Sequence, residues 1–394
     1  MEKLAIFGGT PAISAQPAWP VVEQNDLDAV RDAVLSGGWY RGFGDRNETF
    51  ERAFAEYTGA QYAMTVTNGT AALEVILACA GIGPGDEVIV PAYTFYSTAS
   101  AVAILGATPV FCDVDMDSYN LDCAHAETLV GERTRAIIPV HFGGLPADMG
   151  AVNALAKKYN LFVLEDCSHA HGSPVGTLGN ASSWSFQASK NLTSGEGGAV
   201  LTNDKDLYDR MFSRHTCGRR PEGAWYGHYV TATNLRLSEI QAALLLSQLS
   251  RLEKQTQERM EAAAVLDRAV DEIPFITRVQ HSEPGARRAY HLYMFRYSEA
   301  KTGVSREKFI EALCAEGVTA SVGYPIPLYK QPVYRHMAPP AGQYPYYMLH
   351  LDNVETLCRE TVMITQPHLL GGAPAGEALA SALRKVASQI DALK

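Results

Sequence analysis

Short apolar and β-branched runs alternate with longer helix-like stretches through the middle of this chain. The runs predict strands at residues 87–90, 108–113, 136–140, 162–164, 183–186 and 199–202. Helical patterning fills several intervals between them, at residues 70–80, 96–105 and 147–159. Short buried strands separated by helices are typical of an α/β domain with a mainly parallel sheet. Because ligands of such sheets bind at the carboxyl ends of strands, we expect a site among the loops that follow them.

The last third of the chain has a different pattern. It predicts two strands and two helices, at residues 292–296, 319–322, 305–316 and 375–393. Ser305 is the expected N-cap of the first of these helices. A long helix rich in Ala, Leu and Gln, at 237–265, joins this part to the α/β part. We therefore expect a large α/β domain with an N-terminal arm at 1–250 and a smaller α+β domain at 251–394.

The composition is that of a folded globular protein. Of the 394 residues, 47% are hydrophobic and 19% are charged, which excludes an intrinsically disordered chain. The 33 basic and 43 acidic side chains give a net charge of −10. This balance argues against a general nucleic-acid binder, which needs a basic face.

Targeting signals and cysteine spacing bear on the compartment. No apolar run reaches the ~18–20 residues of a membrane helix, and the short N-terminal apolar patch, broken by two glycines, does not have the pattern of a signal peptide. The seven cysteines are odd in number and lack C-x-x-C spacing, so we expect free thiols rather than disulfides or a zinc site. These features predict a cytoplasmic protein without a membrane partner.

Lys190 is the first residue that suggests chemistry. It lies on a loop after the strand that ends near Ser185, and a glycine cluster follows at 195–198. A lysine in this position can form a Schiff base with a carbonyl cofactor or substrate. A solvated surface lysine is the alternative interpretation, and the more common one for a lysine taken alone.

Asp166 is the second. It ends an apolar strand, where a carboxylate faces the crevice at the sheet edge and can keep a pyridinium nitrogen protonated. A helix cap or a solvated carboxylate is the alternative. The nearby His169 and His171 do not indicate a metal site, because an i, i+2 pair points to opposite sides of a strand and no carboxylate stands at ligand spacing. We expect no metal.

Two further segments complete the pattern. Gly69 and Thr70 open an Ala- and Leu-rich helix, whose first amides and dipole form an anion site suited to a phosphate. An ordinary capped helix is the alternative. Phe95 follows a strand that ends at Pro91, where an aromatic ring can stack on a flat heteroaromatic ring, or can simply pack in the core. A phosphate cradle, a stacking aromatic, a pyridinium-binding Asp and a Ser–Lys segment, in this order, together describe a site for pyridoxal 5′-phosphate (PLP).

The sequence also resembles a known family, the DegT/DnrJ/EryC1/StrS sugar aminotransferases within the fold-type I PLP enzymes. The matching stretches are 67–73, 91–95, 139–143, 165–172, 185–198, 233–243, 290–293 and 324–332, so that the resemblance spans nearly the whole chain. It implies a large domain with a mainly parallel sheet flanked by helices, a smaller α+β domain, and a homodimer with shared active sites.

The resemblance also implies a role for each matching residue. Lys190 would carry the cofactor as a Schiff base and then move a proton, and Asp166 would pair with the pyridine nitrogen. His169 stands where the family has Gln or His near the phenolic oxygen of the cofactor. The remaining cofactor residues implied are Gly69, Thr70 and Ser185 at the phosphate, Phe95 on the ring, and Asn234, which would reach the phosphate of the neighbouring subunit. For Asn234, a helix cap is the alternative.

The reaction implied is ping-pong transamination from glutamate or glutamine to a ketone. Lys190 separates the chain from a deoxygenating branch of the family that carries His at this position. Three acceptors remain open: a cyclitol or other unactivated keto-sugar, which we favour; a nucleotide-linked keto-sugar; and an aminoshikimate-type ring, which an enzyme of the 3-amino-5-hydroxybenzoate synthase type would aromatise. A non-catalytic regulator with the same fold is the least favoured alternative, since Lys190 and Asp166 are both intact.

An acceptor rich in hydroxyl groups would be bound by hydroxyl, imidazole and guanidinium groups beside aromatic rings. The residues we expect to line such a pocket are Tyr40, Arg41, Tyr93, His215, Arg219, Tyr324 and Tyr329. Loop packing is an equally good interpretation of most of them.

Overall fold

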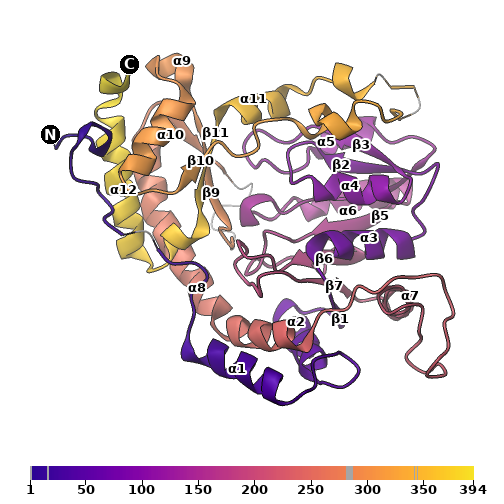
Figure 1. The fold of residues 1–394 in the computed structure, drawn as a ribbon. Helices are drawn as coiled ribbons and strands as arrows, with labels where there is room; N and C mark the ends of the chain where they lie inside the picture. Colours follow the sequence, from indigo (N-terminus) through magenta and orange to yellow (C-terminus); the bar gives the residue numbers. More distant parts are fainter. Residues whose placement is uncertain (1, 16, 281–286, 341, 344) are drawn as a thin grey trace.

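Two β-sheets organise the molecule, one in each of two lobes (Figure 1). The computed structural model describes residues 2–15, 17–280, 287–340, 342–343 and 345–394. The larger sheet has seven strands in the order β1-β7-β6-β5-β4-β2-β3, and the smaller has four in the order β10-β11-β9-β8. Both termini lie on the side of the smaller sheet (Figure 1).

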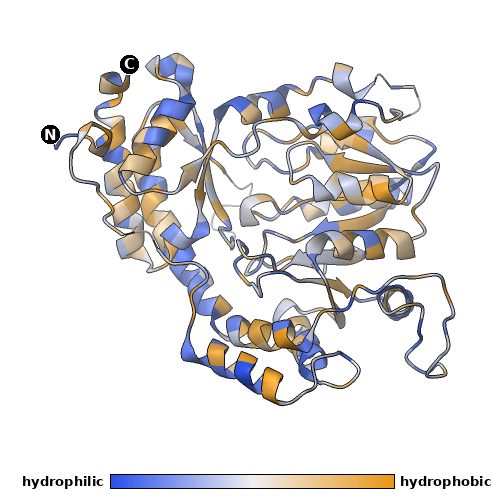
Figure 2. Ribbon diagram, in the orientation of Figure 1, coloured by the Kyte–Doolittle hydropathy of each residue, from blue (hydrophilic) through white to orange (hydrophobic). Residues whose placement is uncertain are grey.

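The large sheet is mainly parallel, as the sequence predicts. Its strands are β1 Tyr62–Val66, β2 Glu87–Pro91, β3 Thr108–Cys112, β4 Thr134–Ile137, β5 Phe162–Asp166, β6 Ala181–Ser185 and β7 Gly198–Thr202. Only β7 runs antiparallel to its neighbours, β1 and β6. Sequence reasoning missed β1, an edge strand of five residues. Figure 2 shows apolar residues along the strands of this sheet, and helices around it that carry both apolar and polar residues.

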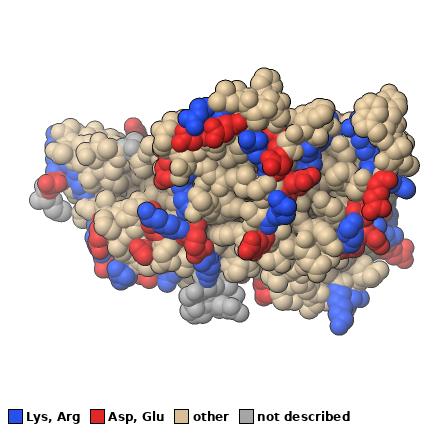
Figure 3. Space-filling view, turned by 90° about the horizontal axis from the view of Figure 1, so that it is seen from below, with Lys and Arg blue, Asp and Glu red and all other residues tan. Residues whose placement is uncertain are grey.

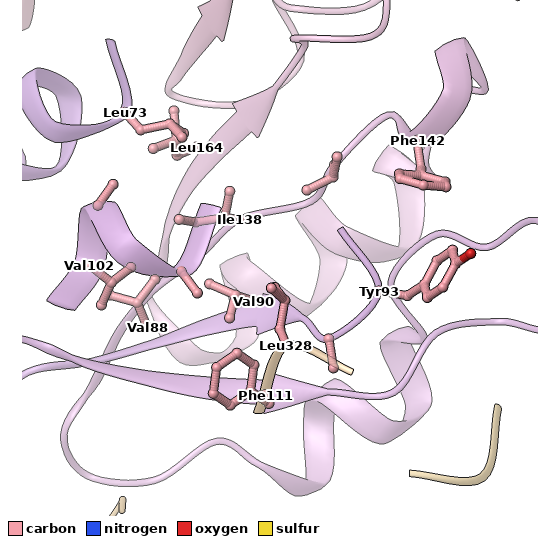
Figure 4. Close-up of a cluster of buried hydrophobic side chains, with 14 of the residues drawn as sticks. Leu73, Val88, Val90, Tyr93, Val102, Phe111, Ile138, Phe142, Leu164 and Leu328 are labelled. Atoms are coloured by element: carbon pink, nitrogen blue, oxygen red, sulfur yellow. The ribbon is translucent and has the colours of Figure 1, made fainter. Parts of the chain in front are cut away.

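Helices cover the large sheet and support its edge. They are α1 Gln24–Leu35, α2 Arg46–Thr58, α3 Gly69–Cys79, α4 Ser97–Ile104, α5 Cys123–Thr128, α6 Met149–Tyr159 and α7 Lys205–His215. The main core lies between α3, α4 and the strands, where Leu73, Val90, Val102 and Leu164 are fully buried (Figure 4). Burial of this kind contributes ~1.5–3 kcal/mol per large aliphatic side chain.

The smaller domain is an antiparallel sheet packed against helices. Its strands are β8 Ile276–Arg278, β9 Leu292–Tyr297, β10 Ala320–Ser321 and β11 Thr361–Thr365, and its helices are α9 Glu299–Thr302, α10 Arg306–Ala315, α11 Asp352–Glu360 and α12 Ala373–Ala387. The predicted cap is confirmed, because the Ser305 hydroxyl accepts a hydrogen bond from the Lys308 amide at 3.3 Å. The closing helix is shorter than predicted and is followed by the 3-10 turn η7 Ile390–Leu393.

Short 3-10 turns shape the connections. They are η1 Ala5–Phe7, η2 Phe142–Gly144, η3 Leu328–Lys330, η4 Pro332–Tyr334, η5 Tyr346–Met348 and η6 Gln366–Leu369. Three of them, η3 to η5, lie within residues 324–348, a segment rich in Pro and Tyr, of which residues 341 and 344 lie outside the described part.

The helix α8 Glu239–Asp271 connects the two domains. It packs against α1, α2 and α12, so residue 250 lies inside a helix that serves both domains. The N-terminal arm also joins them: Leu4 is buried in the core of the smaller domain, and the Glu316 carboxylate accepts hydrogen bonds from the amides of Ala5 and Ala12. The division at residue 250 stays a prediction.

Three features bear on membranes, nucleic acid and redox state. Within the described residues, no helix combines the length and the apolar character needed to cross a membrane. Acidic and basic side chains are interspersed over the face shown in Figure 3, which has no continuous basic field. All seven cysteines are free thiols.

Candidate active site

The start of α3 lies directly against the end of β6, and this contact creates an anion cradle. A Cβ added at Gly69 would lie 2.7 Å from the Cβ of Ser185, so only glycine allows the approach. Asn68 caps the helix, its side chain accepting from the Ala71 amide at 2.8 Å. The amides of Gly69 and Thr70, in the first turn, have no acceptor within the helix. Free amides, the positive helix end and the Ser185 hydroxyl fit a phosphate.

Asp166 is held at the end of β5 in a buried position. One carboxylate oxygen accepts from the Thr98 hydroxyl at 2.9 Å and the other from the Ser168 amide at 3.1 Å. Its own backbone is bonded on both sides, to Pro139 and His141 of the neighbouring segment. Two donors leave lone pairs on the carboxylate for a third partner, which suits a protonated ring nitrogen.

Lys190 lies on the loop after β6 and is half-buried. Burial lowers the pKa of its amine to about 8, although the charge of Asp166 opposes this shift. A lysine with such a pKa has a far larger neutral fraction near pH 7 than an exposed lysine, whose pKa is about 10.4. The neutral amine is the nucleophile in Schiff-base chemistry, so the environment of Lys190 activates it.

His169 is buried beside these groups. Its Nδ1 accepts from the Gly143 amide at 3.3 Å. Burial, and then the charges of Lys190 and His171, hold the pKa of His169 well below its ordinary value. A neutral ring whose Nδ1 is an acceptor carries its proton on Nε2, so His169 has a donor left for a ligand oxygen.

Two aromatic residues of the predicted site, Phe95 and Tyr324, are at least partly exposed. Phe95 lies four positions after the end of β2 and is 55% exposed, so it is accessible for stacking. Tyr324 is half-buried and packs against Tyr93 and Phe142, with ring centroids 5.8 and 5.7 Å away. Burial and then the charge of Asp166 raise the pKa of the Tyr324 hydroxyl, which therefore lies within electrostatic reach of that carboxylate.

Three other predicted residues form a separate group on two loops. Arg219 Nη1 donates to the Tyr40 hydroxyl at 3.2 Å, and the guanidinium of Arg236 lies 5.1 Å from the centre of the Tyr40 ring. Asn234 is exposed, and its side-chain oxygen accepts from the Arg236 amide, at 3.2 Å, in its own segment. The Thr67 amide donates to the Leu235 carbonyl, which ties this group to the cradle.

The remaining four predicted acceptor residues have partners inside the protein. Arg41 forms a buried ion pair with Glu51 and also donates to Thr65. Tyr93 is fully buried at the edge of the main core beside Phe142 (Figure 4). The remaining two are also buried: His215 Nδ1 donates to the Phe212 carbonyl, and the Tyr329 hydroxyl donates to Glu355. Burial and these partners are compatible with a packing role for the four residues, and their contact with an acceptor stays a prediction.

Glu165 is a functional candidate that sequence reasoning missed. It lies in β5 beside Asp166 and is fully buried. It accepts from the amides of Gly176, Leu178 and Gly179 and pairs with His141 Nε2 at 3.1 Å. Burial alone would raise the pKa of Glu165, but the bonds from His141 and these amides hold it below its ordinary value.

The same carboxylate belongs to a cluster with metal-ligand atoms. His141, Glu165 and Cys167 place one ligand atom each within 4.8 Å of one another. His141 Nδ1 accepts from the Ala147 amide at 3.0 Å, so Nε2 carries the proton that Glu165 accepts. The Glu165 carboxylate thus accepts four hydrogen bonds and forms a buried network next to Asp166.

Sequence reasoning did not find Thr98 and Glu165, because the contacts that involve them in the site join separate parts of the chain. Thr98 is 68 positions from Asp166 in the chain, and Glu165 bonds a loop 11 to 14 residues further on. No local pattern marks either contact, since a Thr in a helix and a Glu in a strand have many ordinary uses.

Comparison with known proteins identifies the lineage. The family model described as the DegT/DnrJ/EryC1/StrS aminotransferase family matches residues 20–369. A 3-amino-5-hydroxybenzoate synthase of Amycolatopsis mediterranei is 35% identical, over 91% of this chain and 94% of that protein. An L-glutamine:2-deoxy-scyllo-inosose aminotransferase of Streptomyces paromomycinus is 34% identical, over 98% of this chain and 97% of that protein.

Solved structures agree with this assignment. The DesV protein of S. venezuelae, in complex with a ketimine intermediate, superposes with a TM-score of 0.81 at 33% identity, covering 92% of this chain and 94% of that one. The predicted fold class is thereby confirmed. The chain belongs to the DegT/DnrJ/EryC1/StrS aminotransferase family and is an enzyme that transfers amino groups.

Proposed function

We propose that this protein is a PLP-dependent aminotransferase that moves an amino group from glutamine or glutamate to a ketone of a sugar or cyclitol, in two half-reactions. The observation that carries the proposal is the activated amine of Lys190 beside the buried Asp166. A cyclitol acceptor in aminocyclitol or amino-sugar biosynthesis is favoured by the similarity to the inosose aminotransferase.

The residues present fit the cofactor. The close contact at Gly69 brings the first amides of the helix next to Ser185 and excludes a side chain there, and Asp166 has unused lone pairs. Gly69, Thr70 and Ser185 would hold the phosphate, Asp166 the ring nitrogen, His169 the phenolic oxygen and Phe95 a ring face. When bound, PLP supplies an electron sink that stabilises negative charge on the substrate carbon.

The chain's own groups would then do the following work. Lys190 would hold the cofactor through its neutral amine, and the same amine could accept and return a proton at the reacting carbon of the substrate. Asp166 keeps a proton on the ring nitrogen, since an anion there favours the cationic form. His169 donates from Nε2 and holds the ring against rotation. Thr98 and Ser168 keep Asp166 aimed at the ring.

Tyr40, Arg219 and Tyr324 are the acceptor contacts we retain. Tyr324 faces the Asp166 side of the site, and Tyr40 and Arg219 form a hydrogen-bonded pair on the outer loops. Hydroxyl and guanidinium groups next to aromatic rings suit an acceptor with several hydroxyl groups. Synthesis of 3-amino-5-hydroxybenzoate is the second candidate, because a synthase of this compound is similar over most of the chain.

A homodimer with shared sites is part of the proposal. Large apolar side chains are exposed on loops beside the site: Phe43 is 86% exposed, Trp225 84% and Tyr226 75%. Helix α1 also exposes Leu35, at 76%. Large exposed apolar side chains favour association with a second copy. The exposed Asn234 would then face the partner's phosphate. A cytoplasmic location stays a prediction.

The decisive experiment follows the two half-reactions separately. PLP-loaded protein is treated with glutamine or glutamate, and loss of the visible absorption band at about 400 nm reports the donor step. Inososes, free keto-sugars, nucleotide-linked keto-sugars and an aminoshikimate-type compound are then tested for recovery of the band. Recovery with an inosose supports the proposal. Reaction of the aminoshikimate-type compound alone, with release of water, favours the aromatising activity, and no band at all contradicts both.

A further inference from the structure

His291 lies in the smaller domain just before β9, yet its ring packs on His169. The two ring centroids are 4.4 Å apart, with planes inclined by 37°. Both rings are buried. His291 is thus the point at which the smaller domain touches the group expected at the phenolic oxygen of the cofactor.

A short chain of hydrogen bonds orients the His291 ring. The side-chain nitrogen of Asn191 donates to the Ala289 carbonyl at 2.8 Å, so its oxygen faces the other way. That oxygen lies 3.3 Å from His291 Nδ1, which must therefore be the donor. Asn191 is buried and directly follows Lys190. His291 thus contacts His169, a candidate catalytic residue, and Asn191, the residue that follows Lys190.

The protonation of the two rings follows from their surroundings. Burial, then the nearby His169, Lys190 and His171, hold the pKa of His291 well below its ordinary value. A neutral His291 with its proton on Nδ1 has a lone pair on Nε2, whereas His169 has its proton on Nε2. Each of the two rings thus has one preferred orientation. Reversing His291 would break its bond to Asn191, and reversing His169 would break its bond to Gly143.

The backbone around His291 supports this arrangement. Tyr290 has a φ of +48°, an uncommon conformation for a residue with a side chain. Ala289 bonds to Gly144 and Ser173 of the large domain, and the turn at Tyr290 then directs His291 toward His169. An apolar residue would fill the same space without the cost of burying a polar ring, so the bonds, rather than volume, explain an imidazole here.

We propose that His291 is a positioning residue: through its contacts with His169 and Asn191 it holds in place the His169 ring and the side chain that follows the cofactor-binding lysine. The inference rests on the proposed function and deepens it, since it adds a residue of the smaller domain to the site. His291 acts through its neighbours and is assigned no bond to the substrate.

Two variants of His291 and a control test this. H291F keeps a ring but loses the Nδ1 donor, and H291Q keeps a donor that can reach Asn191. The exposed His336 provides the control, H336F. PLP affinity is measured by titration, and kcat and KM are measured in the donor half-reaction at saturating PLP. For H291F we expect a loss of PLP affinity and of kcat, each on the order of tenfold, with the donor KM within about twofold. H291Q should recover part of both.

A double-variant cycle separates positioning from general damage. N191L removes the Asn191–His291 bond and also the Asn191–Ala289 bond, so it should lose at least as much as H291F. The double variant H291F/N191L should lose no more than N191L alone, because the bond that the two residues share is already gone. Additive losses, or lower thermal stability of H291F with unchanged PLP affinity and kcat, would overturn the proposal. A wild-type protein that binds PLP but transfers no amine contradicts the proposed function alone, because PLP affinity still reports on His291.

Discussion

The cofactor side and the outer acceptor side of the site are built in different ways. On the cofactor side, Asp166, Ser185 and Gly69 stand at the ends of strands or at the start of a helix, and each is held by buried neighbours. On the outer side, Tyr40 and Arg219 lie on two loops and hold mainly each other. The rigid side can place a fixed cofactor, whereas the loop side is free to differ with the acceptor.

The strongest test of the cofactor side is K190A. Removing the amine should abolish the visible band and lower turnover by at least about 10³-fold, because the residue that both binds the cofactor and moves the proton is lost. K157A, at an exposed lysine of α6, is the control. The measurements are the absorption spectrum of the PLP-soaked protein and the rate of the donor half-reaction. Turnover retained in K190A would contradict the assignment.

The next test asks whether Arg41 belongs to the packed interior or to the acceptor side. R41M leaves Glu51 without its cation, and loss of one partner of a buried pair costs about 3 kcal/mol. We therefore expect a lower free energy of unfolding in urea with an unchanged acceptor KM. R31M, at an exposed surface pair, should change neither. A raised acceptor KM at unchanged stability would show that Arg41 contributes to the acceptor site instead.

A smaller effect is expected at the phosphate cradle. G69A forces a Cβ toward Ser185, so the helix start must shift and PLP affinity should fall about tenfold, the equivalent of about 1.4 kcal/mol. G83A is a matched control, since a Cβ there meets no atom within 4 Å. PLP titration measures both. Equal affinities in the two variants would show that the cradle tolerates a side chain.

A further prediction concerns the pH dependence of stability. Burial lowers the pKa of His215 to about 3, so the folded state keeps this ring neutral while the unfolded chain protonates it below about pH 6.5. The unfolded state then binds more protons, and stability falls as pH falls, by about 1.4 kcal/mol per pH unit for each such histidine.

H215F removes one histidine that is protonated mainly in the unfolded chain, so the free energy of unfolding should depend less on pH. Urea unfolding between about pH 6.5 and 5 should show a shallower slope than that of the wild type, and the exposed-site variant H336F should keep the wild-type slope. Equal slopes for H215F and the wild type would mean that His215 titrates normally and is open to solvent, as an acceptor-binding residue would be.

Much of the cofactor side could be predicted from the sequence. Asp166 ends an apolar run, Lys190 follows the next strand, and Gly69 opens a helix, so a parallel sheet brings all three to one edge. Tyr93, Arg41, His215 and Tyr329 have residue types that suit a sugar pocket, but residue type alone does not reveal that they are buried or paired inside the protein. Their contact with an acceptor stays a prediction.

The fold class and the order of the cofactor groups could be predicted from the sequence, because they depend on strand periodicity and on residues close together in the chain. The family was indicated by the resemblance of whole motifs. Which side chains are exposed and which have partners inside the protein could be seen only in the folded molecule. Thr98 on Asp166 and His291 on His169 join positions 68 and 122 residues apart. Such contacts arise from packing between whole elements, and local patterns carry no record of them.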